Sequence, residues 1–180
     1  MVTDLSLPVL LSARGVVVLV RRAGPDDLRA IVRLLSDDPV SAGRGDVASD
    51  EDEDAYASAL RRIIDDPSNE ILVATHQDGT IVGTLQLTVI PGMARRGSTR
   101  LLVEAVRVAS TQRSSGIGGA LMRWVVDVAA VELRAPLVQL TSDAARTDAH
   151  RFYRRLGFVD SHVGFKFAVA LPDASPRGDA

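Results

Sequence analysis

The chain has 180 residues, 46% of them hydrophobic and 24% charged, which is enough for one domain of ordinary size with a sizeable core. Its formal net charge of -2 gives no electrostatic case for nucleic acid or an anionic membrane as the main partner. Cysteine is absent, which excludes disulfides, thiolate metal sites and a catalytic thiol.

The two ends of the chain carry no targeting pattern. The first 15 residues, MVTDLSLPVLLSARG, hold a short apolar patch, but Asp4 stands where a signal peptide would have a cationic segment. We therefore predict a loose N-terminal extension over residues 1–15. No uninterrupted apolar run approaches the roughly 20 residues that span a bilayer, so no membrane partner and a cytoplasmic location are expected. The small, polar residues 172–180 are expected to form a flexible tail.

Between these ends, the hydrophobic pattern predicts alternating strands and helices. Val16 to Val20 are a β-branched run typical of a buried strand, and Asp78-Gly79 is a strong hairpin signal between two apolar runs. The other predicted elements are a helix at 24–35, a loop at 36–50, a helix at 50–64, two strands within 70–90, a turn at 91–98, a strand at 99–110, a helix from residue 117 to Pro136, a strand at 137–142, a helix from 145 ended by Gly157, and a final strand at 163–171. The order β-α-α-β-β-β-α-β-α-β-β predicts a single mixed α/β domain.

The stretch QRSSGIGG, Gln112 to Gly119, lies between a predicted strand and a predicted helix. Free N–H groups at a helix start favour an anion, and missing Cβ atoms let phosphate oxygens approach. A dinucleotide fingerprint is disfavoured, because Leu121 stands where it needs a small residue. A nucleotide P-loop needs a lysine, and this region has none. Glycines that serve packing alone remain an alternative.

Two motifs together resemble one family. The pattern R-x-x-G-x-G, Arg113 to Gly118, follows the strand VEAVRVA and resembles motif A of the GNAT superfamily of N-acetyltransferases. AHRFYRRLGF, Ala149 to Phe158, resembles the A-x-x-F-Y-x-x-x-G-F signature of the same superfamily. The resemblance runs from about Val16 to Leu171 and implies one GNAT domain over residues 16–171. It implies a mixed, mostly antiparallel sheet with a splayed central pair of parallel strands and helices on both faces.

The resemblance implies acetyl-CoA as co-substrate, bound where the strands VEAVRVA and LVQLTS splay apart. The pantetheine arm would meet the backbone of Val106, Arg107 and Val108. The pyrophosphate would lie on the amides of the loop and helix start, namely Arg113, Ser114, Ser115, Gly116, Ile117, Gly118 and Gly119. The chain departs from the family at Ser114, where glycine is frequent, and at Arg146, where asparagine is frequent, so the role of that asparagine is not carried over.

Acetyl transfer to an amine needs a base for the ammonium and an acid for the departing thiolate. The resemblance assigns the acid to Tyr153, whose alternative is a packed aromatic side chain. Glu104 is the candidate base, because a carboxylate in an apolar strand needs a solvated cleft or a partner. Strict alternation puts Glu104 on the face of Leu102, Val106 and Val108, unless the strand contains a bulge. The alternatives are a water relay in place of Glu104, or a structural role for Glu104 as a surface carboxylate or as a partner of Arg107 or Arg100.

The remaining polar residues give weaker signals. His76, His150 and His162 lack metal-ligand spacing, so no metal is expected. The acidic run Ser49 to Asp54 is interpreted as a solvated helix start, although an acidic wall of the acceptor site is the alternative. The acceptor loops would be 36–50, 91–98 and 160–165. The family likeness is compatible with a homodimer, but the sequence has no interface signature.

The sequence thus favours an acetyl-CoA-dependent N-acetyltransferase. Its acceptor would be a primary amine of a small molecule or peptide, attacking the thioester directly in a ternary complex. A non-catalytic acetyl-CoA or CoA sensor on the same fold is the first alternative, and the intact Glu104 and Tyr153 argue against it. A protein that binds a different nucleotide is the second alternative, and Leu121 argues against that one.

Overall fold

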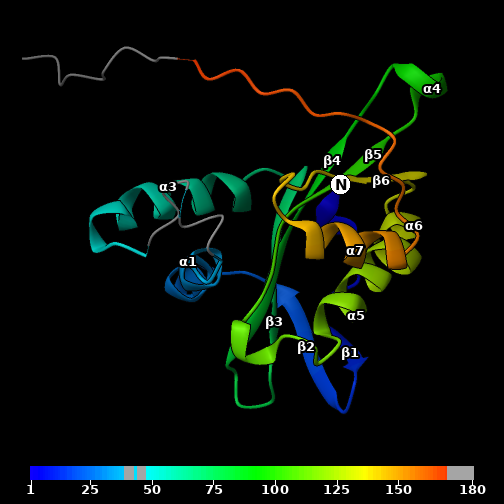
Figure 1. Cartoon of the computed structure of the whole chain (residues 1–180). Helices are drawn as coiled ribbons and strands as arrows, with labels where there is room; N and C mark the ends of the chain where they lie inside the picture. The colour runs from blue at the N-terminus through cyan, green and yellow to red at the C-terminus, as the bar shows by residue number, and fades with distance from the viewer. Residues whose placement is uncertain (39–42, 44–47, 170–180) are drawn as a thin grey trace, which may run out of the picture.

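A computed structural model describes residues 1–38, 43 and 48–169 of the chain. Its centre is a six-stranded sheet with helices on both faces (Figure 1). The strands are β1 (Val9–Ala13), β2 (Val16–Arg22), β3 (Asn69–Thr75), β4 (Ile81–Ile90), β5 (Arg100–Val108) and β6 (Leu137–Leu140). They lie in the sheet in chain order, and each pair is antiparallel except β5 and β6, which are parallel. The predicted mixed, mostly antiparallel sheet is confirmed.

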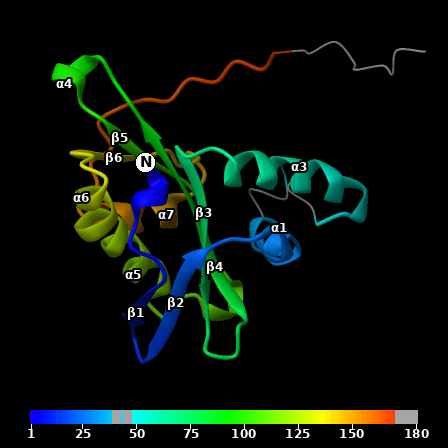
Figure 2. The same cartoon turned by 180° about the vertical axis from the view of Figure 1, so that it is seen from behind.

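The helices form two layers, which Figures 1 and 2 show from opposite sides. On one face lie α1 (Leu28–Ser36) and α3 (Glu53–Ile64), and α1 packs through Ile31 against Ala23 and Val73. The other face is covered by α5 (Ile117–Trp124), the π-helical turn η5 (Val125–Ala129), α6 (Ala130–Glu132) and α7 (Thr147–Arg155). The remaining short elements are η1 (Val2–Asp4), η2 (Pro25–Asp27), η3 (Asp50–Asp52), η4 (Ser110–Gln112) and the single turn α4 (Ala94–Gly97). The predicted helices on both faces are therefore confirmed.

The largest core lies between the sheet and the second helix layer. Apolar side chains at alternate strand positions meet the stripe that the sequence places on α5, because strand side chains point alternately to the two faces. Its fully buried members include Leu85, Leu87, Leu101, Ile117, Leu121 and Met122. This packing fixes the position of the start of α5 relative to β5. The glycine stretch, Gln112 to Gly119, connects these two elements.

Two turns that the sequence singled out have the expected backbone. Gly79 has φ +85° in the β3–β4 hairpin, where the amide of Thr80 donates to Asp78 Oδ1 at 2.9 Å. Gly157 has φ +92° directly after α7, and the amide of Phe158 donates to the carbonyl of Tyr153 at 3.1 Å. Positive φ is unfavourable for residues with a Cβ, so glycine terminates both elements without strain.

The prediction of a loose N-terminal extension over residues 1–15 is wrong. Residues 2–4 form η1, and β1 pairs with β2 along the register Val9↔Val20 to Ala13↔Val16. Val2 and Leu5 are buried in the main core, with exposed fractions of 0% and 3%. The apolar patch therefore stabilises the fold, since it covers one end of the core and extends the sheet by one strand.

Leu5→Ala is expected to lower the free energy of unfolding by about 2–3 kcal/mol, because it removes buried methyl groups and leaves a cavity. Leu10→Ala is the matched control in the same segment, since Leu10 is 67% exposed, and should change it by less than about 0.5 kcal/mol. Urea denaturation followed by circular dichroism measures both values. Equal effects of the two substitutions would mean that the N-terminal segment does not pack as described.

The predicted final strand over residues 163–171 is also absent where the structure describes it. Residues 163–169 pair with no strand in the described part of the chain and leave the body of the molecule as an extended segment (Figure 1). Residues 170 and 171 and the predicted tail at 172–180 lie outside the described residues. Among the described helices, none has the length and apolar character needed to cross a bilayer.

Candidate active site

The parallel strands β5 and β6 separate halfway along β5. Their register runs from Arg100↔Leu137 to Val103↔Leu140 and stops there, although β5 continues to Val108. On the side that faces β6, residues 104–108 of β5 therefore have no strand partner among the described residues. Unpaired backbone donors and acceptors require other partners, so this splay offers a hydrogen-bonding edge to an extended ligand.

A bulge in β5 lies at the same place. Ala105 has φ +51°, and the register with β4 shifts between Gln86↔Glu104 and Thr84↔Arg107. Residues directly paired across two strands point to the same face, so Glu104 and Arg107 share a face with Gln86 and Thr84. Val106 and Val108 pack on the main core, on the opposite face. Strict alternation is therefore right for Leu102, which shares the face of Glu104, and wrong for Val106 and Val108, and the bulge is the physical reason.

Glu104 is exposed beside a small cavity on the face covered by α1 and α3. The cavity holds about 130 Å³ and reaches the bulge at Ala105. Its lining is almost entirely apolar, with Thr84 and Gln86 as the polar members beside Leu28, Ile31, Val32, Leu35, Tyr56, Ala59, Leu60, Ile63 and Ile71.

The stretch Gln112 to Gly119 forms a tight turn into α5. Ser114 and Gly116 both have positive φ, of 67° and 86°. Gly116 is the N-cap of α5, and the first bond along the helix runs from the amide of Ala120 to its carbonyl at 2.9 Å. The amides of the three residues between them have no partner within a helix, which leaves three donors at its positive end.

The three glycines have different reasons for lacking a side chain. Gly116 has positive φ, and a Cβ there would lie 3.1 Å from Arg14 Cγ and 3.2 Å from the Arg14 amide. A Cβ on Gly118 would meet Val108 and Phe152 at ordinary distances of 3.5 and 3.6 Å. The three atoms nearest to a Cβ on Gly119 would all belong to the guanidinium of Arg123, a flexible group. The fold therefore explains why residue 116 is a glycine. Contacts within the chain do not explain why residues 118 and 119 are glycines.

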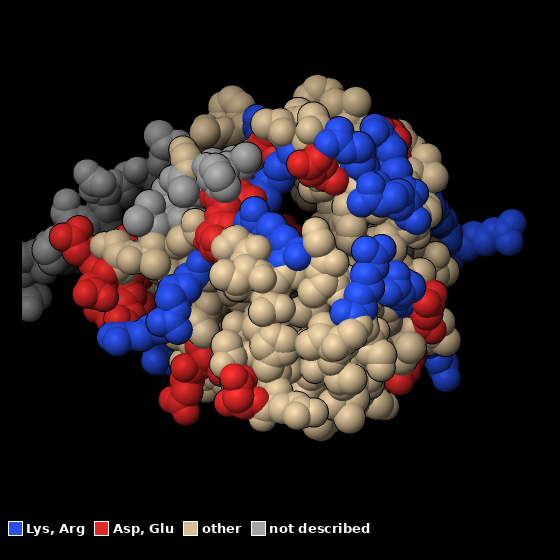
Figure 3. Space-filling model, turned by 60° about the horizontal axis from the view of Figure 1, so that its bottom comes forward, with Lys and Arg blue, Asp and Glu red and all other residues tan. Residues whose placement is uncertain are grey.

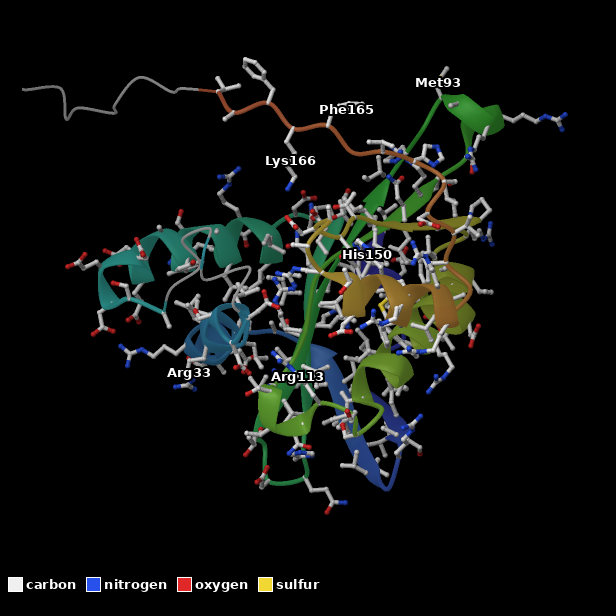
Figure 4. All side chains as sticks on the ribbon, viewed as in Figure 1. Arg33, Met93, Arg113, His150, Phe165 and Lys166 are labelled. Atoms are coloured by element: carbon white, nitrogen blue, oxygen red, sulfur yellow. The ribbon has the colours of Figure 1, made fainter. Side chains whose placement is uncertain are left out.

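The C-terminal end of α1 contacts both sides of the splay. The Ser110 amide donates to Asp37 Oδ2 at 2.6 Å and holds the pKa of that carboxyl below its ordinary value. The exposed Arg113 donates to the carbonyl of Asp37 at 2.8 Å, and Figure 4 shows Arg113 between its loop and α1. Arg146, at the start of α7, forms a half-buried ion pair with Asp38 at 2.6 Å. Figure 3 shows a hollow on one face of the molecule, with basic and acidic side chains beside it.

Tyr153 lies in α7 and is enclosed by two aromatic rings. Phe152 and Phe158 lie edge-on, with ring centroids at 5.1 and 5.9 Å from that of Tyr153. Burial raises the pKa of the Tyr153 phenol, and the nearby charges of Arg107 and Arg146 offset only part of that rise. The phenol therefore stays protonated through the neutral range, as a proton donor must.

Three site residues were missed by the sequence analysis. Asp37 and Asp38 gave no local signal, because their partners lie 73 to 108 residues further along the chain. Ser142 follows β6 at the splay, and its Oγ is buried without a hydrogen-bond partner among the described residues. A buried hydroxyl of this kind has a free donor and acceptor for a ligand.

The other candidate groups have structural partners or are solvated. His150 Nε2 lies 2.8 Å from the carbonyl of Asp143, which ties the start of α7 to the loop before it. The acidic run is exposed at the start of η3 and α3, where Ser49 Oγ accepts from the amide of Glu51 at 3.2 Å. Within the described ranges, no three His, Asp or Glu side chains cluster as a metal site would require.

The sequence pattern of the Acetyltransferase (GNAT) family matches residues 28–158. The chain belongs to this family. An aminoalkylphosphonate N-acetyltransferase from Salmonella typhimurium is 36% identical over 69 residues, which are 38% of this chain and 43% of that protein. The chain thus spans less than half of the length of this relative. The GNAT match begins at α1 and ends at Phe158, so it includes the glycine stretch and the Tyr153 motif.

Solved structures support the GNAT fold. A transcriptional regulator from Bacillus halodurans C-125 is 38% identical, with a TM-score of 0.79 over 84% of this chain and 99% of that one. A glucosamine-6-phosphate N-acetyltransferase from Arabidopsis thaliana has a TM-score of 0.67 at 17% identity, over 84% of this chain and 97% of that one, and shows likeness of fold alone. The resemblance read from the two sequence motifs is confirmed at the level of family and fold.

Proposed function

We propose that this GNAT protein transfers an acetyl group from acetyl-CoA to a small primary amine. The observation that carries the proposal is the splay: on one side of β5, no strand of the described chain pairs with residues 104–108, next to the start of α5. The pantetheine arm of acetyl-CoA would pair with the backbone of Val106 to Val108. Its pyrophosphate would lie on the loop and helix start at 113–119, where anions are favoured.

The residues at the splay suit a CoA thioester better than a nucleotide alone. The buried, unpartnered Oγ of Ser142 on the β6 side offers a bond to an amide of the pantetheine arm. The contacts within the chain would tolerate a Cβ at Gly118 and at Gly119, so they do not explain why these residues are glycines. Clearance for phosphate oxygens does explain them. Arg113 is exposed beside this surface and can move from the Asp37 carbonyl to a phosphate oxygen.

In the proposed reaction the amine nitrogen attacks the thioester carbonyl carbon, the new C–N bond forms, and the C–S bond breaks. The ammonium first loses its proton to Glu104, directly or through water, which the exposure of Glu104 permits. The departing sulfur takes the proton of Tyr153, the nitrogen of the new amide loses its second proton to solvent, and solvent returns a proton to the phenolate. The raised pKa of Tyr153 matches this task, because the acid must be protonated when the thiolate forms.

The acceptor would enter on the face of Glu104, because the cavity between α1, α3 and the bulge opens beside it. A cavity of about 130 Å³ is well below the roughly 300–1,000 Å³ of sites for drug-sized ligands. This size favours a small amine, or the terminal amine of a larger molecule. The relative from Salmonella typhimurium, described as acting on aminoalkylphosphonates, supports small aminoalkyl compounds as the first acceptors to test.

A second candidate function is a regulator that binds acetyl-CoA or CoA without catalysis. The relative from Bacillus halodurans, described as a transcriptional regulator, supports this candidate. The enclosed and protonated Tyr153 at the splay argues for catalysis, since a binding module has no need of a proton donor there.

The test of the proposed function has two stages. Thermal unfolding is measured with acetyl-CoA, CoA, ATP and NAD, and we expect stabilisation by the two CoA compounds only. Release of free thiol from acetyl-CoA is then measured with aminoalkylphosphonates, polyamines, aminoglycosides and peptide N-termini, and with no acceptor as control. Stabilisation by ATP or NAD alone contradicts the proposal. Binding of acetyl-CoA without amine-dependent thiol release favours the regulator.

A further inference from the structure

Gln86 lies in the lining of the small cavity, directly opposite Glu104. The two residues are cross-strand partners in β4 and β5, so their side chains project from the same face of the sheet. Directly opposed residues in neighbouring strands have Cβ atoms about 4.5–5.5 Å apart, so one small group of a ligand can contact both side chains. The proposed reaction gives Glu104 a role and leaves Gln86 without one.

Asn69, at the start of β3, fixes the orientation of the Gln86 amide. Donation from the Ser68 amide, and then from Asn69, holds the pKa of the Asp66 carboxyl below its ordinary value. The ionised carboxylate can only accept, so Asn69 presents Nδ2 to Asp66 Oδ2, at 2.7 Å. Asn69 Oδ1 is thereby directed toward β4, where it accepts from Thr88 Oγ1 at 2.5 Å and from Gln86 Nε2 at 3.3 Å. The Gln86 amide therefore presents its nitrogen to Asn69 and directs its oxygen, Oε1, elsewhere.

Gln86 Oε1 is available to a ligand. Among the described residues, none donates a hydrogen bond to it, and the Gln86 side chain is half-buried. Thr84, the other polar residue of the cavity, differs, because its Oγ1 donates to the carbonyl of Leu72 at 2.9 Å. Gln86 Oε1 and the Glu104 carboxylate are both acceptors, so the group that fits between them is a donor with at least two hydrogens.

We propose that Gln86 Oε1 accepts a hydrogen bond from the attacking amine, and that Asn69 is the positioning residue that holds the Gln86 amide in this orientation. This inference rests on the proposed function, because it takes the cavity beside Glu104 as the acceptor site. The ammonium gives one proton to Glu104, and a second N–H, which the nitrogen retains, donates to Gln86. Gln86 thus holds the nitrogen in place before and after deprotonation, and the covalent steps remain those of the proposed reaction.

The pair of acceptors selects an amine over an alcohol. A primary ammonium has three N–H donors, so it satisfies Gln86 and Glu104 at the same time. A hydroxyl has one O–H donor and satisfies only one of them, which leaves the other facing the lone pairs of an oxygen. A site that leaves one of its polar groups unpaired discriminates strongly against the ligand that causes this loss.

The experiment measures binding separately from turnover. Aminoethylphosphonate and hydroxyethylphosphonate differ only in the attacking group, and each is titrated by calorimetry into protein saturated with CoA. We expect Gln86→Met, which keeps the length of the side chain and removes its amide, to bind the amine about tenfold or more weakly, the usual effect of losing a hydrogen bond to a charged group. Binding of the hydroxyl compound and of CoA should change by less than about twofold. Gln77→Met is the matched control, because Gln77 is exposed in the β3–β4 hairpin and should leave all three affinities unchanged.

Asn69→Leu tests the positioning role. It should weaken binding of the amine and leave binding of the hydroxyl compound nearly unchanged, whereas a purely structural role of Asn69 would weaken both compounds equally. The inference is overturned if Gln86→Met binds the amine as tightly as the parent, or if the parent binds the amine no more tightly than the hydroxyl compound.

Thiol release from acetyl-CoA, measured on the same variants, distinguishes this inference from the proposed function. We expect Gln86→Met to raise KM for the amine with a smaller change of kcat, because the hydrogen bond is present in both the bound state and the transition state. Loss of amine binding in Gln86→Met, together with no thiol release from the parent, would support the amine site and contradict catalysis. Thiol release by the parent with the same KM in Gln86→Met would support catalysis and contradict the role of Gln86.

Discussion

Replacing Tyr153 by phenylalanine is expected to lower kcat for acetyl transfer by about 100-fold or more, the usual range for loss of a general acid. The ring contacts with Phe152 and Phe158 remain, so the fold and the affinity for acetyl-CoA should change little. Only the proton donor is lost, and its effect falls on the departing thiolate. Steady-state thiol release gives kcat, and acetyl-CoA titration by calorimetry gives the dissociation constant.

The pH profile separates an acid role from a packing role. Because the pKa of Tyr153 lies above its ordinary value, the phenol remains protonated past the pH of about 10 at which an exposed tyrosine ionises. In the parent protein, the fall of kcat at high pH that is caused by ionisation of Tyr153 should therefore occur above that pH. The Tyr153→Phe variant should not show this fall. Unchanged kcat in the variant would remove Tyr153 from the mechanism. A lower kcat with an equal loss of stability would assign it to packing.

The sequence predicted best those elements whose signals are local. Asp78-Gly79 and Gly157 each define a turn through their own backbone preferences, and both turns are present with positive φ at the glycines. The glycine stretch and the Tyr153 motif each occupy about ten consecutive residues. Their order and spacing can therefore be recognised from the sequence without knowledge of tertiary contacts.

The two errors in the fold arise from partners that are distant or absent. β1 belongs to the sheet because β2 pairs with it, and the apolar run at its start gave no period that identifies a strand. The segment 163–169 has the right alternation but meets no strand in the described chain. Alternation specifies which face of a strand is apolar, whereas it does not specify the strand that will pair with it.

In the candidate site, strict alternation wrongly placed Val106 and Val108 on the face of Glu104. One extra residue at Ala105 reverses the alternation of everything after it, and no residue type in VEAVRVA marks that position. The role of Arg146 was likewise unreadable, since its partner Asp38 lies 108 residues away. Long-range electrostatic contacts of this kind depend on the completed fold.

Gly116→Val is expected to lower the free energy of unfolding by about 2–5 kcal/mol and to abolish stabilisation by acetyl-CoA. Gly116 has φ +86°, which is strained for a β-branched residue and costs on the order of 1–3 kcal/mol. The added Cβ would also lie 3.2 Å from the Arg14 amide, which donates to the carbonyl of Ser115 at 2.9 Å. That hydrogen bond holds the end of β1 against the loop before α5. The backbone at Arg14 would therefore have to move to make room for the added Cβ, which costs a further free energy of similar size. Urea denaturation and thermal unfolding with acetyl-CoA measure the two effects.

Gly119→Ala is the matched control, three residues further along the same turn. The atoms nearest to its added Cβ would be those of the Arg123 guanidinium, at 3.2 Å and beyond, and that flexible group can move. Alanine also favours a helix over glycine by about 1 kcal/mol, so the unliganded variant should be as stable as the parent or more stable. If clearance for a phosphate is the reason for Gly119, the same variant should bind acetyl-CoA at least about tenfold more weakly, which corresponds to about 1.4 kcal/mol. If the Gly119→Ala variant binds acetyl-CoA as tightly as the parent, Gly119 has no role in the cofactor site. If the Gly116→Val variant is as stable as the parent, the tight turn described at Gly116 is wrong.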